Sequence, residues 1–549
     1  MKAHPLSPYQ IPMFALIAGV SICSGLTPSA MAQMAEFPDP AAVHAQEDLA
    51  NRTMGDFEAN ADPQAGLNPE FSASAAAALD PGTVGKWSGI IGGLPVVPIF
   101  AALLPDGRVL MWDSVGDNPA ESYTDHTFTR AAVWDPETST FTNVNLSGHN
   151  IFCAGFAHLT DGSLFVAGGN KDKQLNGIKQ THIFDYNNDT WYAGPNMAYE
   201  RWYPSVATLA DGEHVVMGGG PSISEVTQGD HTSFRKLTKA NWGSHAREYP
   251  FVQIAPNGKV LYAGPKNKMK FLGTQGTGTW QVFGSRDALY RYYGSYAIFD
   301  ANAAKWLVAG GGSSGAVPTN TAVVIDANGA TPVASSTGNM NYKRRQHNLT
   351  VLPDGTVLAT GGLSSTAAQV DLNAAVYHAE LWNPQTGTWT TLAQQAVARQ
   401  YHSVALLLPD GKVMSGGGGV CGKCQEKGYL RKDIENFSPP YLFKKDGSGL
   451  PADRPQIFSA PSNVHYGVPF TINVTQVSIS KIALTKLPAA THGQDMDQRY
   501  VPVSFIPLGS GNLQVTPPAT SNIAPPGHYM LWVVDSLGVP SKARIIRIT

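Results

Sequence analysis

The chain has 549 residues, of which only 14% are charged, and its formal net charge is -3 at pH 7. So small a net charge gives no electrostatic argument for binding nucleic acid or an anionic membrane. Glycine and proline are abundant, with 56 and 39 residues, and low charge combined with many turn-forming residues is typical of an all-β protein.

The N-terminus has the pattern of an export signal. Lys2 precedes an apolar run from Ile11 to Leu26, and Ala30-Met31-Ala32 offers a cleavage site of small residues. The run is shorter than the roughly 20 residues that a membrane span needs. We therefore expect residues 1–32 to be a signal peptide and the mature chain to be secreted or periplasmic, without a membrane span. Residues 33–85 show no clear period, which predicts a linker or an extended N-terminal tail.

One pattern recurs seven times after Trp87. Each copy is an apolar run, a tight turn and a second apolar run that usually ends in Gly-Gly. Asp-Gly or Asn-Gly between two β-like runs is the strongest short signal for a hairpin. The copies are AALLPDGRVLMW, AHLTDGSLFVAGG, ATLADGEHVVMGGG, QIAPNGKVLYAG, IFDANAAKWLVAGGG, TVLPDGTVLATGG and ALLLPDGKVMSGGGG. The fifth copy lacks the glycine turn and is the weakest.

A second element recurs between the copies, as AVWDPETSTF, HIFDYNNDTW and ELWNPQTGTW. We interpret it as the outer hairpin of the same unit, because a period of roughly 50 residues is typical of a four-stranded kelch blade. Seven copies predict a seven-bladed kelch-type β-propeller over residues 86–450. Residues 451–549 have no Gly-Gly ends and contain short alternating strands such as PFTINVTQV and YMLWVVD, which predict an Ig-like β-sandwich.

Three chemically active side chains share one place in the repeat. Cys153, Tyr203 and His402 each stand eight positions before the Asp of their Asp-Gly turn. Because the innermost strand of a blade runs along the central channel, a fixed offset from the turn selects one end of that channel. We therefore expect a thiol, a phenol and an imidazole to converge at one mouth, where Tyr401 adds a second phenol.

This set of side chains predicts a metal or redox site. Phenolate oxygens with imidazole nitrogens suit Cu(II) in a tetragonal arrangement. One further imidazole would complete the set, and His492 in the polar loop PAATHGQDMDQRY is the candidate.

The remaining cysteines of the mature chain form a CxxC pair, Cys421 and Cys424. A zinc half-site, a redox motif and a structural disulfide all fit this spacing. The sequence contains no second CxxC or His pair that would complete a zinc site, and export favours the disulfide. That pairing would leave Cys153 outside any disulfide.

Four segments resemble the copper radical oxidases, the family of galactose oxidase and glyoxal oxidase. They are FCAGF around Cys153, RWYPS around Tyr203, YHSVALLLPDGKVMSGGGGVCGKC from Tyr401, and ATHGQDMDQR around His492. The resemblance spans about Trp87 to the C-terminus. It implies that the C-terminal sandwich is of the galactose oxidase early-set type.

The resemblance also implies a cofactor that the chain makes from its own side chains. Tyr203, His402 and His492 are the implied equatorial ligands of Cu(II), and Tyr401 is the axial phenol that takes the substrate's hydroxyl proton. Cys153 is implied to form a thioether with Tyr203, which then holds a stable radical. Cu(II) and this radical would together remove two electrons from a primary alcohol or a hydrated aldehyde, and O2 would be reduced to hydrogen peroxide.

Trp202 is similar to the stacking tryptophan of the glyoxal oxidase branch. Galactose oxidase carries Gly before the equivalent tyrosine and has an N-terminal sugar-binding domain, for which residues 33–85 are too few. The resemblance therefore implies a chain closer to the glyoxal oxidase branch, with glyoxal, methylglyoxal or an alcohol as substrate. Arg344 is implied to hold a substrate oxygen, with Arg345 as the alternative and His347 behind the site. We expect a monomer.

Two other classes of function compete with an oxidase. A non-catalytic kelch propeller would bind glycan or protein at the channel mouth, without copper or a Cys153–Tyr203 link. A propeller hydrolase of the sialidase kind would need paired acids, an arginine cluster and Asp-box repeats, and the sequence contains no convincing Asp box.

Overall fold

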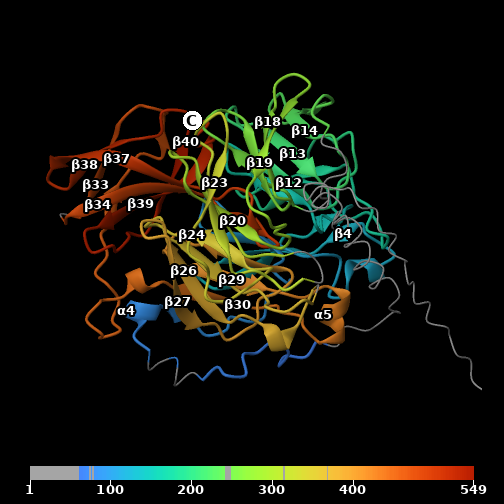
Figure 1. The fold of residues 1–549 in the computed structure, drawn as a ribbon, viewed down its shortest axis with the longest axis horizontal. Coiled ribbons are helices and arrows are strands. Elements are labelled where there is room, and N and C mark those ends of the chain that lie inside the picture. Colours follow the sequence, from blue (N-terminus) through green and yellow to red (C-terminus); the bar gives the residue numbers. More distant parts are fainter. Residues whose placement is uncertain are drawn as a thin grey trace, which may run out of the picture.

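The computed structural model of the chain describes residues 61–72, 76, 79–241, 249–312, 316–367, 369–475 and 477–549. The predicted signal peptide lies outside these residues, as does the part of the predicted tail before residue 61. Seven sheets form a propeller, and a second β domain follows it in the chain (Figure 1). The predicted fold class, a seven-bladed propeller followed by an early-set type β domain, is confirmed.

Six blades follow one another along the chain, each with four antiparallel strands ordered from the channel to the rim. Their bounds are β2 (Phe100–Leu103), β3 (Val109–Trp112), β5 (Ala131–Asp135) and β6 (Thr140–Asn143); β8 (Gly155–His158), β9 (Leu164–Ala167), β10 (Thr181–Asp185) and β11 (Thr190–Ala193); β12 (Pro204–Thr208), β13 (His214–Gly218), β14 (Glu225–Gln228) and β15 (Ser233–Lys236); β16 (Phe251–Ile254), β17 (Val260–Gly264), β18 (Lys268–Gly273) and β19 (Thr279–Ser285); β20 (Ser295–Asp300), β21 (Lys305–Ala309), β22 (Ala322–Asp326) and β23 (Val333–Ser336); β24 (Asn348–Val351), β25 (Val357–Thr360), β26 (His378–Asn383) and β27 (Thr388–Gln394). A separate pair, β4 (Phe128–Thr129) and β7 (Leu146–Ser147), lies between the first two blades in the chain.

The predicted inner hairpins carry the core of the propeller. In the first blade every residue of β2 and β3 is buried, whereas β6 is largely exposed. The turn glycines adopt left-handed backbone angles, for example φ 91° at Gly107 and 87° at Gly355, which glycine reaches without steric cost. The fifth copy forms its hairpin without such a glycine: Ala304 takes φ 51°, and the register shifts between Ile298 and Asp300.

The seventh blade is completed by the start of the propeller sequence. Its inner strands are β28 (Ser403–Leu407), β29 (Val413–Gly417) and β30 (Ile434–Ser438), and its outermost strand is β1 (Lys86–Trp87). Trp87 pairs with Phe437. This strand joins the two ends of the ring and covers an edge that would otherwise be open.

The described part of the N-terminal tail packs against the last two blades. Leu67 forms a β-bridge with Val397, and the Asn68 side chain donates to the carbonyl of Gln395 at 3.2 Å. The short helix α4 (Pro81–Val84), capped by Asp80, then leads into β1.

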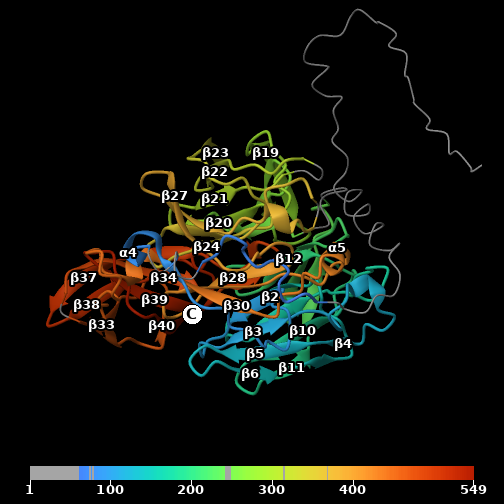
Figure 2. The same ribbon diagram turned by 90° about the horizontal axis from the view of Figure 1, so that it is seen from below.

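The C-terminal domain lies beside the propeller in both ribbon views (Figures 1 and 2). Its long strand β37 pairs with β34 through its first half and with β38 through its second, so it belongs to both parts of the domain. The strands are β31 (Ile457–Ser459), β32 (Asn463–Val464), β33 (Phe470–Val474), β34 (Ile479–Lys486), β37 (Tyr500–Gly509), β38 (Asn512–Thr516), β39 (Gly527–Asp535) and β40 (Arg544–Ile548).

One hairpin of this domain enters the propeller channel. Its strands are β35 (Ala489–Thr491) and β36 (Gln494–Asp495), and β35 pairs antiparallel with β2, the innermost strand of the first blade. On another side of the channel, the Gln498 side chain accepts from the amide of Val351 at 2.8 Å and donates to the carbonyl of Leu349 at 2.7 Å. The hairpin is thus held by both the first and the sixth blade.

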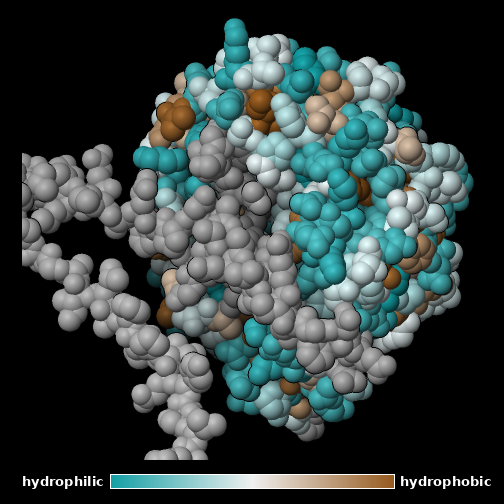
Figure 3. Space-filling view, turned by 90° about the vertical axis from the view of Figure 1, so that its right-hand side faces the viewer, coloured by the Kyte–Doolittle hydropathy of each residue, from teal (hydrophilic) through white to brown (hydrophobic). Residues whose placement is uncertain are grey.

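The visible surface is mainly polar. Over the described part of the face in Figure 3, hydrophilic residues predominate and hydrophobic residues are scattered. Among the residues that the structure describes, no helix has the length and apolar character of a membrane span.

Candidate metal centre

The residues at the eight-residue offset stand together at one mouth of the channel. Cys153, Tyr203 and His402 all have left-handed backbones, with φ of 60°, 65° and 67°. The backbone hydrogen bonds also run from blade to blade, since the amide of Tyr203 donates to the carbonyl of Cys153 at 2.8 Å. Left-handed φ is uncommon outside glycine, so the shared conformation shows that these are equivalent places in the repeat.

Three further residues occupy the same place and were missed in the sequence. Tyr249 stands eight positions before Asn257 of an Asn-Gly turn, and Gln346 stands eight before Asp354. Tyr293 is the equivalent residue of the fifth blade, whose turn lacks glycine. Their φ angles are 20°, 58° and 53° for Tyr249, Gln346 and Tyr293. The offset could therefore have identified the first two.

Five predicted side chains form one buried cluster. The Cys153 sulfur and one ring nitrogen each of His402 and His492 all lie within 4.8 Å of one another. The hydroxyl oxygens of Tyr203 and Tyr401 are 2.7 Å apart, and the Tyr203 ring centroid lies 5.1 Å from that of His492. The structure thus brings a thiol, two phenols and two imidazoles together.

The imidazoles are oriented by hydrogen bonds at Nδ1. Nδ1 of His402 pairs with the carbonyl of Gly419 at 2.6 Å, and Nδ1 of His492 pairs with Oγ1 of Thr491, also at 2.6 Å. Such bonds fix the ring and leave Nε2 as the nitrogen that can bind a metal. Two such nitrogens with two phenol oxygens form a donor set that suits Cu(II), so the residues present fit copper.

Burial dominates the electrostatics of the cluster. It raises the pKa of Tyr203 well above its ordinary value, and the neighbouring Cys153, Tyr401 and Tyr249 raise it further. The thiol of Cys153 is also a hydrogen-bond partner of the Tyr203 side chain. In the absence of a cation the phenol is therefore held in its neutral form, beside the sulfur.

Trp202 contacts Tyr203 edge to face. Their ring centroids are 4.3 Å apart and their planes meet at 84°. The two side chains leave adjacent backbone positions, and the indole therefore reaches the phenol from the side.

Arg344, predicted to hold a substrate oxygen, lies in a buried ion pair. Its guanidinium is 0% exposed, pairs with Glu380 at 2.5 Å and donates to the carbonyl of Gly361 at 2.9 Å. The same contact to the glycine end of the second strand recurs in three other blades, from Arg201 to Gly218, Arg291 to Gly310 and Arg399 to Gly417. The repeated arginine therefore supports each of these four blades. Arg345 and His347 are also fully buried.

Substitution Arg344→Ala should destabilise the protein without changing substrate binding. Removing one partner of a buried ion pair leaves the carboxylate of Glu380 uncompensated, which costs about 3–5 kcal/mol. We expect a lower midpoint of chemical unfolding, with KM of the folded fraction unchanged. A raised KM at unchanged stability would restore the substrate role of Arg344.

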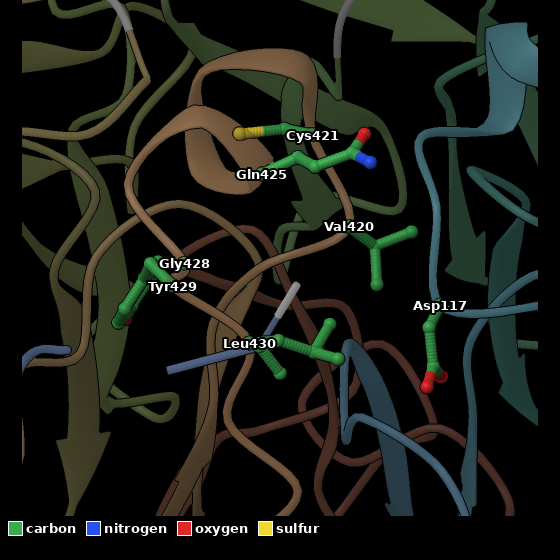
Figure 4. Close-up of a pocket in the computed structure, with 8 residues that line it drawn as sticks. Asp117, Val420, Cys421, Gln425, Gly428, Tyr429 and Leu430 are labelled. Carbon is green, nitrogen blue, oxygen red and sulfur yellow. The ribbon is translucent and has the colours of Figure 1, made fainter. Parts of the chain in front are cut away.

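The loop that orients His402 also carries a disulfide. Cys421 and Cys424 are joined, and the Cys421 sulfur accepts the amide of Cys424 at the start of α5 (Gly422–Glu426). Both cysteines pack in one apolar cluster with Tyr401. The loop borders a small pocket, which is lined by Val420 and by Asp117 of the first blade (Figure 4). The disulfide thus stiffens the segment directly after Gly419.

Comparisons with known proteins agree with this cluster. Residues 454–548 match the family model of the galactose oxidase-like early set domain. A galactose oxidase of Gibberella zeae is 32% identical over 531 residues, which cover 91% of this chain and 76% of that protein. The aldehyde oxidase GLOX of Vitis pseudoreticulata is 27% identical over 443 residues, which cover 72% of this chain and 82% of that protein.

A solved structure is similar over most of the fold. It is a fungal alcohol oxidase of the AA5 family in complex with copper, with a TM-score of 0.78 and 29% identity, and the match covers 85% of this chain and 100% of that one. These relatives are compatible with the glyoxal branch and with the alcohol-oxidising members alike. The non-catalytic and hydrolase alternatives are set aside, because the chain belongs to the galactose oxidase family and is a copper radical oxidase.

Proposed function

We propose that the protein is a secreted oxidase that removes two electrons from a primary alcohol or a small aldehyde and reduces O2 to hydrogen peroxide. The observation that carries this proposal is the buried cluster in which the Cys153 sulfur lies beside the phenol of Tyr203 and two imidazoles. Cys153 and Tyr203 would be joined by a thioether, and the modified tyrosine would hold the radical.

Each residue of the cluster has a distinct role in this proposal. Tyr203, Tyr401, His402 and His492 would hold copper. Bound copper supplies a one-electron acceptor and a Lewis acid for the substrate oxygen. The oxygen of Tyr401 lies 2.7 Å from that of Tyr203. In its phenolate form, Tyr401 receives the hydroxyl proton of the substrate.

The surroundings of Tyr203 favour a long-lived radical. Tyr203 is only 3% exposed, and the rings of Trp202 and Tyr249 lie against it with centroids at 4.3 and 4.9 Å. These rings exclude water and reductants from the phenol. A sulfur substituent spreads the unpaired spin over a larger group, which lowers the reduction potential of the radical.

The substrate class is a primary alcohol or a small aldehyde of the glyoxal or methylglyoxal type. Trp202 directly before Tyr203 supports the aldehyde branch. The copper-bound relative is named as an alcohol oxidase, and this supports the alcohol branch.

The test is the mass of the peptides that hold Cys153 and Tyr203. After expression without copper, addition of Cu(II) and air should give a cross-linked pair lighter by two hydrogens, together with peroxide production from alcohols, glyoxal or methylglyoxal. Tyr203→Phe removes the phenol while keeping the ring, so it should give neither the link nor turnover. If Cys153 can still be alkylated after copper loading, the proposal is wrong.

A further inference from the structure

The ring of Tyr249 lies against Tyr203, one partner of the proposed thioether, and against His492, a proposed metal ligand. It is 4% exposed. Its ring centroid is 4.9 Å from that of Tyr203, with an interplanar angle of 68°, and 4.9 Å from that of His492, with an angle of 43°. One side chain of the fourth blade therefore contacts both the third blade and the C-terminal hairpin.

Three hydrogen bonds connect Tyr249 to the cysteine segment. Its hydroxyl donates to the carbonyl of Ala154 at 3.1 Å, and its amide donates to the carbonyl of Tyr203 at 2.9 Å. The amide of Tyr203 donates in turn to the carbonyl of Cys153 at 2.8 Å. These bonds close a loop that fixes the turn at Cys153 against Tyr203.

The turn at Cys153 needs such support. Its φ of 60° lies in the left-handed region, and a non-glycine residue held there stores strain of order 1–3 kcal/mol that the surroundings must offset. The hydroxyl of Tyr249 is the side-chain contact that holds the carbonyl of the next residue, Ala154. Without it, the cysteine sulfur would sample positions away from the ring of Tyr203.

Tyr249 is itself a poor site for the radical. Its hydroxyl donates to a backbone carbonyl, which accepts a hydrogen bond but has no basic site to take the proton. Losing an electron at Tyr249 would therefore leave a charged phenol in a buried place, which is costly. The ring of Tyr249 can therefore pack against Tyr203 without the radical transferring from Tyr203 to Tyr249.

We propose that Tyr249 is the positioning residue for formation of the Cys153–Tyr203 thioether, an inference that rests on the proposed function. In that step the S–H bond of Cys153 and the ring C–H bond ortho to the Tyr203 hydroxyl are broken, and one C–S bond forms. The two electrons and two protons pass to O2, which becomes hydrogen peroxide. Tyr249 holds the sulfur at the ring carbon and is not consumed.

The test follows the rate of cross-linking in the full chain. Copper-free wild type and Tyr249→Phe receive Cu(II) and air, and the cross-linked peptide is quantified by mass at intervals. Tyr249→Phe keeps the ring against Tyr203 and His492 but loses the hydrogen bonds of the hydroxyl to the carbonyl of Ala154 and to the side chain of Thr491. Because a hydrogen bond contributes about 0.5–1.5 kcal/mol, we expect cross-linking to be about 2- to 12-fold slower, with the copper stoichiometry unchanged.

A matched control is Tyr296→Phe. Tyr296 is also a buried phenol whose hydroxyl donates to a backbone carbonyl, that of Val252 at 3.3 Å. Cross-linking in this variant should proceed at the wild-type rate. Once Tyr249→Phe has been cross-linked to completion, its kcat should return to within about twofold of wild type, because the residue acts on formation of the cofactor.

The outcomes separate the two proposals. If wild type forms no thioether with copper and air, the proposed cofactor is wrong. If wild type forms the thioether and Tyr249→Phe forms it at the same rate, the role of Tyr249 is overturned. The same holds if cross-linking in Tyr296→Phe is slowed as much as in Tyr249→Phe. If Tyr249→Phe folds poorly, Ala154→Gly is the second variant, because it keeps the carbonyl but loosens the turn. It should also slow cross-linking. A wild-type rate of cross-linking in Ala154→Gly would overturn the inference.

Discussion

Replacement of His492 by alanine should lower the affinity for Cu(II) by at least about 100-fold, with the propeller still folded. His492 is one of two imidazoles in the cluster, and its ring centroid lies 4.6 Å from that of His402. Loss of a mere hydrogen-bond partner of a ligand already costs 10–100-fold in metal affinity, so loss of a ligand should cost more. Copper titration of the purified apoprotein measures the effect, and circular dichroism reports the fold.

The control for this substitution is His465→Ala in the same domain. His465 is exposed, and its Nδ1 pairs only weakly with the carbonyl of Thr549 at 3.3 Å. Copper affinity should be unchanged in this variant. Equal copper affinity in His492→Ala and wild type would show that the metal centre is built from the propeller alone.

The second large effect is expected at Asp497, at the base of the same hairpin. Its carboxylate lies 2.5 Å from Nζ of Lys486 and 2.8 Å from Nδ1 of His158, and the side chains are at most 2% exposed. Breaking a buried pair leaves an uncompensated charge, so Asp497→Ala should lower the free energy of unfolding by about 3–5 kcal/mol. Denaturant titration at pH 7 measures it.

The same pair gives the stability a defined pH dependence. Burial by itself would raise the pKa of Asp497, but Lys486 and His158 outweigh it and hold the pKa well below its usual value. The contribution of this carboxylate is therefore full above about pH 4, the pKa of an unfolded aspartate, and it is lost as the pH falls through the folded-state pKa. The difference between wild type and Asp497→Asn should shrink as the pH is lowered below 4.

An exposed carboxylate of the same domain is the control. The side chain of Asp453 is 96% exposed, and surface substitutions usually change stability by less than about 0.5 kcal/mol. If Asp497→Ala and Asp453→Ala prove equally stable, the buried network around Lys486 does not support the hairpin.

The hairpin signals predict the blades because they are local. An Asp-Gly turn between two apolar runs specifies its own pair of strands, so the number of turns gives the number of blades. A fixed offset from each turn gives the residues that meet at one mouth of the channel. The same logic would have found Tyr249 from its Asn-Gly turn. It fails at Tyr293, because the fifth turn uses Ala304 in place of glycine.

Other parts of the site depend on long-range pairing that no local pattern specifies. The two residues of β1 are too few to show a strand period, and their pairing with Phe437 and Ser438 marks them as part of the seventh blade. The hairpin around His492 has equally short strands, and its entry into the channel is set by pairing with β2. The contact of Arg344 is repeated in four blades, and it becomes evident only when the blades are compared.

The closing strand β1 also bears on the order of folding. The blade of His402 is completed by residues near the start of the chain, and His492 arrives from near its end. Pairings so distant in sequence have high contact order and form slowly, because the loop-closure entropy is lost before the contacts are gained. We therefore expect the metal centre to be among the last parts to assemble, and a chain interrupted before its C-terminal hairpin would lack His492 and bind copper weakly.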